Sequence, residues 1–138
     1  MQRIEKIAEK VGHLLDAETE IELDCCLVRK ERTLQIQSNQ HCFTCKLDLD
    51  ISFKHLKEDG TAVNKAEICL LPEEFTDFLK ILRSHPIPLP TDYSQWLEEN
   101  PNLICVHLES KEPPEHFAER LATALQSLNQ VDREVFFM

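Results

Sequence analysis

The sequence predicts a single α+β domain over residues 1–138, with an antiparallel sheet of about four to five strands and helices packed on one face. Three observations lead to this prediction. Several segments alternate apolar and polar residues, as strands with one buried face do. Other segments repeat apolar residues every three to four positions, as amphipathic helices do. Most strand patterns come early in the chain and most helical patterns later, which favours the order α-β-β-β-β-α-α-β-α.

The first half of the chain contains one helical pattern and then four strand patterns. Apolar residues at helical spacing from Gln2 to Ala17 predict about four turns of helix. Alternation predicts strands over Ile21 to Leu27, Thr33 to Gln37, His41 to Phe53 and Lys65 to Leu71. Arg29 to Arg32 is expected as a charged turn. The first three strands, joined by short polar links, predict an antiparallel meander with one solvent-facing side.

Prolines mark the elements of the second half. Pro72 is expected to begin a helix, because its missing N–H costs nothing there, and this helix ends near His85, before Pro86. The other predicted elements are a rigid proline connector from Pro86 to Pro90, a short helix from about Asp92 to Glu99, a strand from Leu103 to Leu108 and a final helix that begins at Pro113 and Pro114.

The charge of the chain restricts its partners. Fifteen Lys and Arg against 25 Asp and Glu give a net charge of −10, which repels nucleic acid and anionic membranes and attracts basic proteins. We expect the outer sheet face to carry a continuous acidic, partner-binding patch of Glu22, Asp24, Asp48 and Asp50. The larger acidic share is expected on the C-terminal helices, at Glu73, Glu74, Asp77, Glu98, Glu99, Glu112, Glu115 and Glu119.

Nucleotide binding and export are both disfavoured by the sequence. It has only two glycines and neither glycine-rich phosphate-binding motif, so we expect no cofactor. Residues 1–10 are charged and lack the apolar stretch of a signal peptide. No apolar run approaches the roughly 18 residues that span a bilayer. We therefore expect a soluble cytoplasmic protein.

A CxxC motif is the strongest chemical signal in the sequence. Cys42 and Cys45, preceded by His41, could form a redox pair, or half of a zinc site with Cys25 and Cys26. Residues three apart in a strand face opposite sides of the sheet, which argues against both. We therefore expect six free thiols, no metal site and no catalytic residue. A small enzyme or metal-binding regulator that uses His41, Cys42 and Cys45 is kept as an alternative.

Aromatic residues supply the other candidate contacts. Tyr93 and Trp96, in the predicted short helix, are of the types that often anchor protein interfaces. The chain ends in an apolar segment that includes Phe136 and Phe137, although chain ends are usually polar. We expect this segment to dock on its own core or on a second copy, in preference to acting as a binding tag.

These features predict a non-catalytic acidic protein-binding module of the inhibitor, immunity or adaptor type, whose partner is another protein, favoured to be basic. The opening helix, the three-strand meander and the final amphipathic helix resemble class I type III secretion chaperones. The resemblance implies a homodimer. Those chaperones have a pair of strands between their last two helices, where this sequence predicts only the strand from Leu103 to Leu108.

Overall fold

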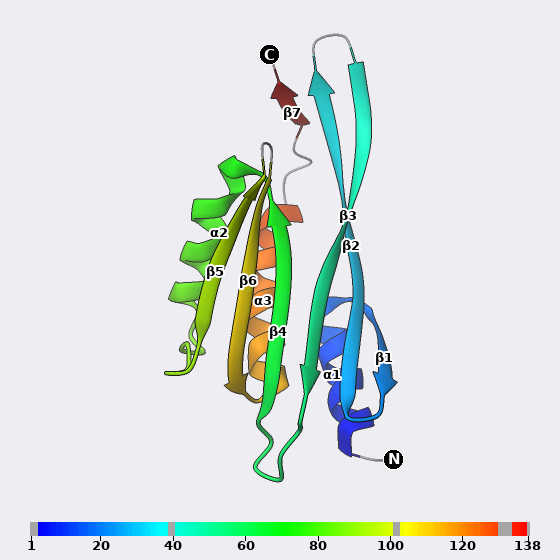
Figure 1. The fold of residues 1–138 in the computed structure, drawn as a ribbon, viewed down its shortest axis with the longest axis vertical. Coiled ribbons are helices and arrows are strands. Elements are labelled where there is room, and N and C mark those ends of the chain that lie inside the picture. The colour runs from blue at the N-terminus through cyan, green and yellow to red at the C-terminus, as the bar shows by residue number, and fades with distance from the viewer. Residues whose placement is uncertain (1–2, 39–40, 101–102, 130–133, 138) are drawn as a thin grey trace.

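The computed structural model describes residues 3–38, 41–100, 103–129 and 134–137 (Figure 1). Within these residues the fold is α+β, with three helices and six antiparallel strands in the order α-β-β-β-β-α-β-β-α and a short strand after the last helix. The elements are α1 Arg3–Leu15, β1 Glu18–Glu22, β2 Cys25–Ser38, β3 His41–Lys54, β4 Ala62–Leu70, α2 Pro72–Ser84, β5 Ser94–Asn100, β6 Leu103–Glu112, α3 Pro114–Asn129 and β7 Glu134–Phe137.

The strands form one sheet in the order β1-β2-β3-β4-β6-β5. Each pair along this path is antiparallel, and β7 pairs in parallel with the far end of β2. Only five residue pairs join β3 to β4, from Asp50 opposite Glu67 to Lys54 opposite Val63. Beyond them the hairpin of β2 and β3 diverges from β4 (Figure 1).

The core lies between the helices and one face of the sheet. In β4 the residues at even positions, from Ala62 to Leu70, are all buried, and in β6 Val106 and Leu108 point to the same side. Helix α3 packs against α1 and α2, and α1 and α3 lie behind the sheet in Figure 1. In the part of the chain that the structure describes, α1 and α3 therefore cover one face of the sheet (Figure 1). We call the other side the open face.

The first predicted strand and the turn after it are wrong. The segment from Ile21 to Leu27 is a hairpin between β1 and β2, with its turn at Leu23 and Asp24. The expected turn at Arg29 to Arg32 lies inside β2. The strand continues because its charged residues have partners. The Arg29 guanidinium binds the Glu20 carboxylate of β1, and Arg32 is buried in an ion pair.

The predicted short helix from Asp92 to Glu99 is also wrong, because most of this segment is strand β5. All seven residues of β5 pair with β6, from Ser94 opposite Glu109 to Asn100 opposite Leu103. These ladder hydrogen bonds outweigh the weak helical spacing of so short a segment. The strand pair between the last two helices that the sequence did not predict is therefore present.

Leu23 is held in an unfavourable backbone conformation at the tip of the first hairpin. Its φ is 55°, in the left-handed region, and its side chain is 99% exposed. Left-handed geometry costs a non-glycine residue about 1–2 kcal/mol. We expect Leu23→Gly to raise the free energy of unfolding in urea by about 1 kcal/mol. Leu97→Gly, at an exposed leucine inside β5, should lower it instead, and a loss of stability in Leu23→Gly would contradict this explanation.

Candidate functional site

A row of six residues crosses the open face, one from each strand of the main path. The order across the sheet is Glu18, Arg29, Asp50, Glu67, His107 and Trp96, each opposite the next. Directly opposed residues of an antiparallel sheet point to the same side, so these side chains share the open face. The row therefore runs from acidic and basic groups at β1 and β2 to an imidazole and an indole at β6 and β5.

A groove of about 780 Å³ follows this row. Both basic and acidic side chains line it. Arg29 and Lys65 lie among carboxylates that include Asp48, Asp50 and Glu67. Trp96 and His107 are the lining residues with aromatic rings. The predicted acidic patch is therefore not continuous, since Arg29 and Lys65 lie among its carboxylates. The groove presents a mixed, predominantly acidic surface with an aromatic end.

The aromatic end is a stacked pair. The rings of Trp96 and His107 lie parallel, with an interplanar angle of 3° and centroids 5.1 Å apart. His107 Nε2 lies 3.3 Å from a Glu98 carboxylate oxygen and 4.0 Å from a Glu67 oxygen. The Glu98 contact is short enough for an ion pair, but it lacks the alignment of a hydrogen bond, so the buried Nε2 has no hydrogen-bond partner. The stack holds Trp96 in place while 46% of its surface stays exposed.

Only some of the predicted contact residues lie in the groove. Asp48 and Asp50 are exposed, and they line it together with Trp96. Glu22 is exposed at the end of β1, and Asp24 lies in the hairpin turn, where its carboxylate contacts His55 Nδ1 at 2.7 Å. The hairpin thus separates Asp24 from the strand face on which it was predicted.

Tyr93 packs against the core and does not line the groove with Trp96. It is half-buried against the core and donates a hydrogen bond from its hydroxyl to Gln95 Oε1 at 2.9 Å. Burial is the largest cause of the rise in the pKa of Tyr93 to about 12. Tyr93 is therefore a packing residue, and Trp96 is the aromatic group that the groove presents.

The C-terminal segment pairs with its own chain. In β7, Phe136 lies opposite Gln37 and Phe137 opposite Ser38 of β2. The side chains of both phenylalanines lie outside the described residues. The backbone register is that of a segment added in parallel to the edge of β2.

The sequence interpretation missed the groove residues Arg29, Lys65, Glu67 and His107. Alternation within β6 was the available signal, because Val106 and Leu108 face the core and so place His107 on the open face. The sequence does not show which strands lie next to each other in the sheet. β4 pairs with β6 across the whole intervening α2–β5 segment, and this non-local pairing brings Glu67 to His107.

A model of the family described as Domain of Unknown Function (DUF1259) matches residues 8–127. The chain belongs to this family. The match extends from α1 into α3, so the open face and its groove belong to the DUF1259 domain, whereas β7 follows it. No curated protein and no solved structure matches the chain. None of the helices in the described ranges is long and apolar enough to cross a membrane.

The cysteines of this DUF1259 protein fall into three groups. Cys25 and Cys26 are free thiols as predicted, and burial, followed by the charge of Cys25, raises the pKa of Cys26 to about 11. Cys69 and Cys105 form a disulfide between β4 and β6, so the prediction of free thiols is wrong for this pair. The side chains of Cys42 and Cys45, and of His41 beside them, lie outside the described residues.

Proposed function

We propose that the DUF1259 domain is a non-catalytic protein-binding module that binds a segment of another protein along the groove of the open face. The observation that carries this proposal is Trp96, an indole that lies 46% exposed at the end of a groove and is held there by His107. Tryptophan is enriched among the residues that dominate binding energy at protein interfaces. A stacked indole has little side-chain freedom to lose on binding, which favours association.

The charges of the groove indicate the chemistry of the partner. Asp48, Asp50 and Glu67 outnumber Arg29 and Lys65 in its lining, and the whole chain carries a net charge of −10. A partner segment rich in Lys or Arg, with an apolar side chain for Trp96, complements both features. Arg29 and Lys65 would fix the register of such a segment by repelling its basic residues locally.

We expect the double substitution Asp48→Asn/Asp50→Asn to weaken partner binding without loss of fold, because both carboxylates are exposed. The effect should be largest at low ionic strength, where screening is weakest.

Trp96→Ala should weaken binding by about 2 kcal/mol or more at every salt concentration, as a hot-spot residue does. The measurement is the affinity of a basic protein that wild-type chain captures from its host, purified and titrated across a salt series.

The chain offers a direct report of where binding occurs. Trp96 is the only tryptophan, so its fluorescence should change when the purified partner binds in the groove. The matched control is Glu73→Gln/Asp77→Asn, which removes two exposed carboxylates from α2, away from the open face. If the groove variant and the α2 variant lose affinity equally, only net charge is involved and the groove proposal fails.

A second candidate function is that of a homodimeric chaperone like those of type III secretion. The observation that favours it is the β5–β6 pair between α2 and α3, which was the one element of that resemblance missing from the sequence prediction. Sedimentation equilibrium of the full chain tests this candidate. A dimer at low micromolar concentration supports it, and a monomer throughout the concentration range contradicts it.

A further inference from the structure

Metal-binding side chains from three strands gather at one end of the open face. Cys69 and Cys105 are directly opposed on β4 and β6, and the next pair of these strands on the open face is Glu67 opposite His107. On β5, Glu98 lies opposite Cys105. Cysteine, histidine and glutamate are the residue types from which protein zinc sites are built. The cluster therefore combines two sulfurs, an imidazole and carboxylates on one surface.

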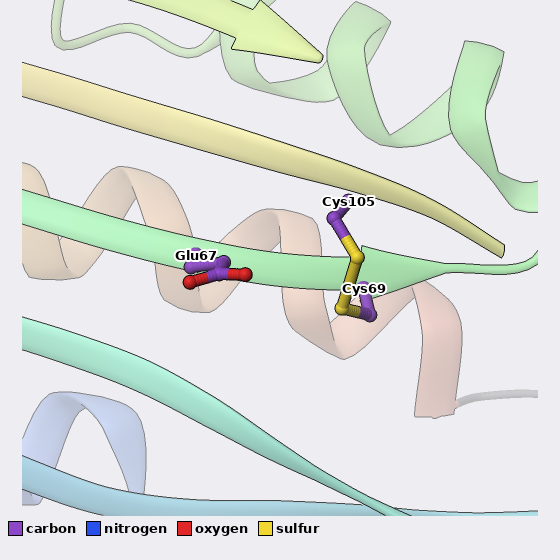
Figure 2. Close-up of side chains that lie close together, drawn as sticks. All are labelled: Glu67, Cys69 and Cys105. Atoms are coloured by element: carbon purple, nitrogen blue, oxygen red, sulfur yellow. A yellow bond between two sulfur atoms is a disulfide. The ribbon is translucent and has the colours of Figure 1, made fainter. Parts of the chain in front are cut away.

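The donor atoms lie close enough for a single ion. One carboxylate oxygen of Glu67 and the sulfurs of Cys69 and Cys105 all lie within 4.8 Å of one another. Figure 2 shows the Glu67 carboxylate and the two sulfurs together on the side of β4 that faces away from α3. Zn–S bonds of about 2.3 Å and Zn–O bonds of about 2.0–2.2 Å put two ligands of one ion roughly 3.5 Å apart. Small side-chain rotations therefore suffice to bring the Glu67 oxygen and the two sulfurs to bonding distance from one ion.

His107 is the natural fourth ligand. Its Nε2 lies outside the group of atoms within 4.8 Å but is 4.0 Å from the Glu67 carboxylate, one member of that group. The atom is buried and makes no hydrogen bond within the described residues, which costs free energy even though a Glu98 carboxylate oxygen lies 3.3 Å away. A bound cation would supply that partner. The parallel stack on Trp96 fixes the plane of the imidazole and so the direction in which its nitrogens can bind.

We propose that Cys69 and Cys105, once reduced, bind a zinc-type divalent ion together with Glu67 and His107. The disulfide and the metal are alternative states of one site, because thiolate sulfurs are the ligands and disulfide sulfurs are not. A dithiol reductant gives two electrons and two protons to the disulfide and becomes a disulfide itself. Metal binding then forms two metal–sulfur bonds and releases the two thiol protons to solvent. This site does not depend on the proposed protein-binding role.

The test is a titration of the purified full chain with Zn²⁺ and with Co²⁺. A phosphine reduces the protein beforehand, becoming a phosphine oxide with oxygen from water, because a dithiol would compete for the metal. Reduced wild type should bind one equivalent and develop the sulfur-to-cobalt charge-transfer absorption of a thiolate site. The oxidised protein should bind none at this site. Absence of that absorption in reduced wild type would overturn the proposal.

Variants locate the metal and separate this site from the other cysteines. His107→Gln leaves every cysteine in place and should weaken zinc binding by more than about tenfold, since losing an outer-shell partner alone costs 10- to 100-fold. The variant Cys25→Ser/Cys26→Ala/Cys42→Ser/Cys45→Ser should bind as wild type does. The proposal fails if Cys69→Ser/Cys105→Ser, folded by circular dichroism, keeps the charge-transfer band, or if His107→Gln leaves the affinity unchanged.

Discussion

Arg120→Leu is expected to destabilise the domain by about 3–5 kcal/mol, the usual cost of removing one member of a buried ion pair. Arg120 lies in α3 and is 2% exposed, and its partner Glu112, at the end of β6, is 5% exposed. Arg120 Nη1 donates to Glu112 Oε1 at 2.8 Å, and Nη2 donates to the other carboxylate oxygen. The substitution would leave the Glu112 carboxylate buried with only the Ser110 hydroxyl as a described side-chain donor.

Urea denaturation measures the effect, and the chain provides a matched control. Arg29 also binds a carboxylate, that of Glu20, but the two side chains are 67% and 44% exposed. Water screens such a pair, so Arg29→Leu is expected to leave the free energy of unfolding almost unchanged. Equal losses in the two variants would mean that the cost is a general effect of replacing Arg by Leu. The double variant Arg120→Leu/Glu112→Leu should recover much of the loss, since no buried charge is left alone.

The elements that could be predicted from the sequence are those whose signal is local. β3 carries strict alternation over most of its length, and α2 has Pro72 at its first position with acidic residues in its first turn. Both were confirmed, with small shifts at the ends. Asp48 and Asp50 were placed correctly on an exposed strand face for the same reason, because alternation alone assigns residues to a face.

The elements that failed depend on partners distant in the chain. Ser94 to Asn100 is too short to distinguish helix from strand by its own pattern, and its pairing with β6 decides the outcome. The hairpin turn at Leu23 was missed because leucine is not one of the residues that usually adopt positive φ. The disulfide required the register of β4 against β6, which joins residues 36 apart in the chain.

Charged residues were the other source of error. Glu74 and Glu112 were predicted as part of the surface charge of the C-terminal helices, yet both are buried, and Glu112 ends a strand. A lone charged residue is almost never buried, so a sequence interpretation assigns it to the surface unless its partner is known. The partner of Glu74 is 42 residues away in β2, which no local pattern could identify. The net charge of −10 therefore overstates the acidity of the surface helices.

Glu74→Ala is expected to cost about 3–5 kcal/mol as well, because it leaves the Arg32 guanidinium buried without its carboxylate. Glu74 is fully buried, and its two oxygens accept hydrogen bonds from Arg32 Nη1 at 2.9 Å and Nη2 at 2.7 Å. Its Oε1 also accepts the Leu71 N–H at 2.9 Å, at the start of α2. Urea denaturation again gives the change in the free energy of unfolding.

Glu74→Gln separates the two roles of this carboxylate. The amide oxygen can still accept the Leu71 N–H, so the start of α2 should stay ordered, while the ion pair with Arg32 is lost. Hydrogen exchange at the Leu71 amide should therefore rise in Glu74→Ala and change little in Glu74→Gln, although both variants lose stability. If both variants protect that amide equally, the carboxylate does not order the helix start.

The position of this ion pair explains why its loss should be felt beyond α2. Arg32 belongs to β2, and its Nη1 also lies 3.4 Å from the carbonyl oxygen of Cys69 in β4. Cys69 lies past the five pairs that join β3 to β4, where the hairpin of β2 and β3 diverges from the rest of the sheet (Figure 1). The guanidinium therefore connects the diverging hairpin to both β4 and α2. The double variant Arg32→Leu/Glu74→Leu leaves no buried charge, so it should recover part of the free energy of unfolding lost in Glu74→Ala. Hydrogen exchange at the end of β4 should still increase, because the guanidinium no longer connects the hairpin to β4.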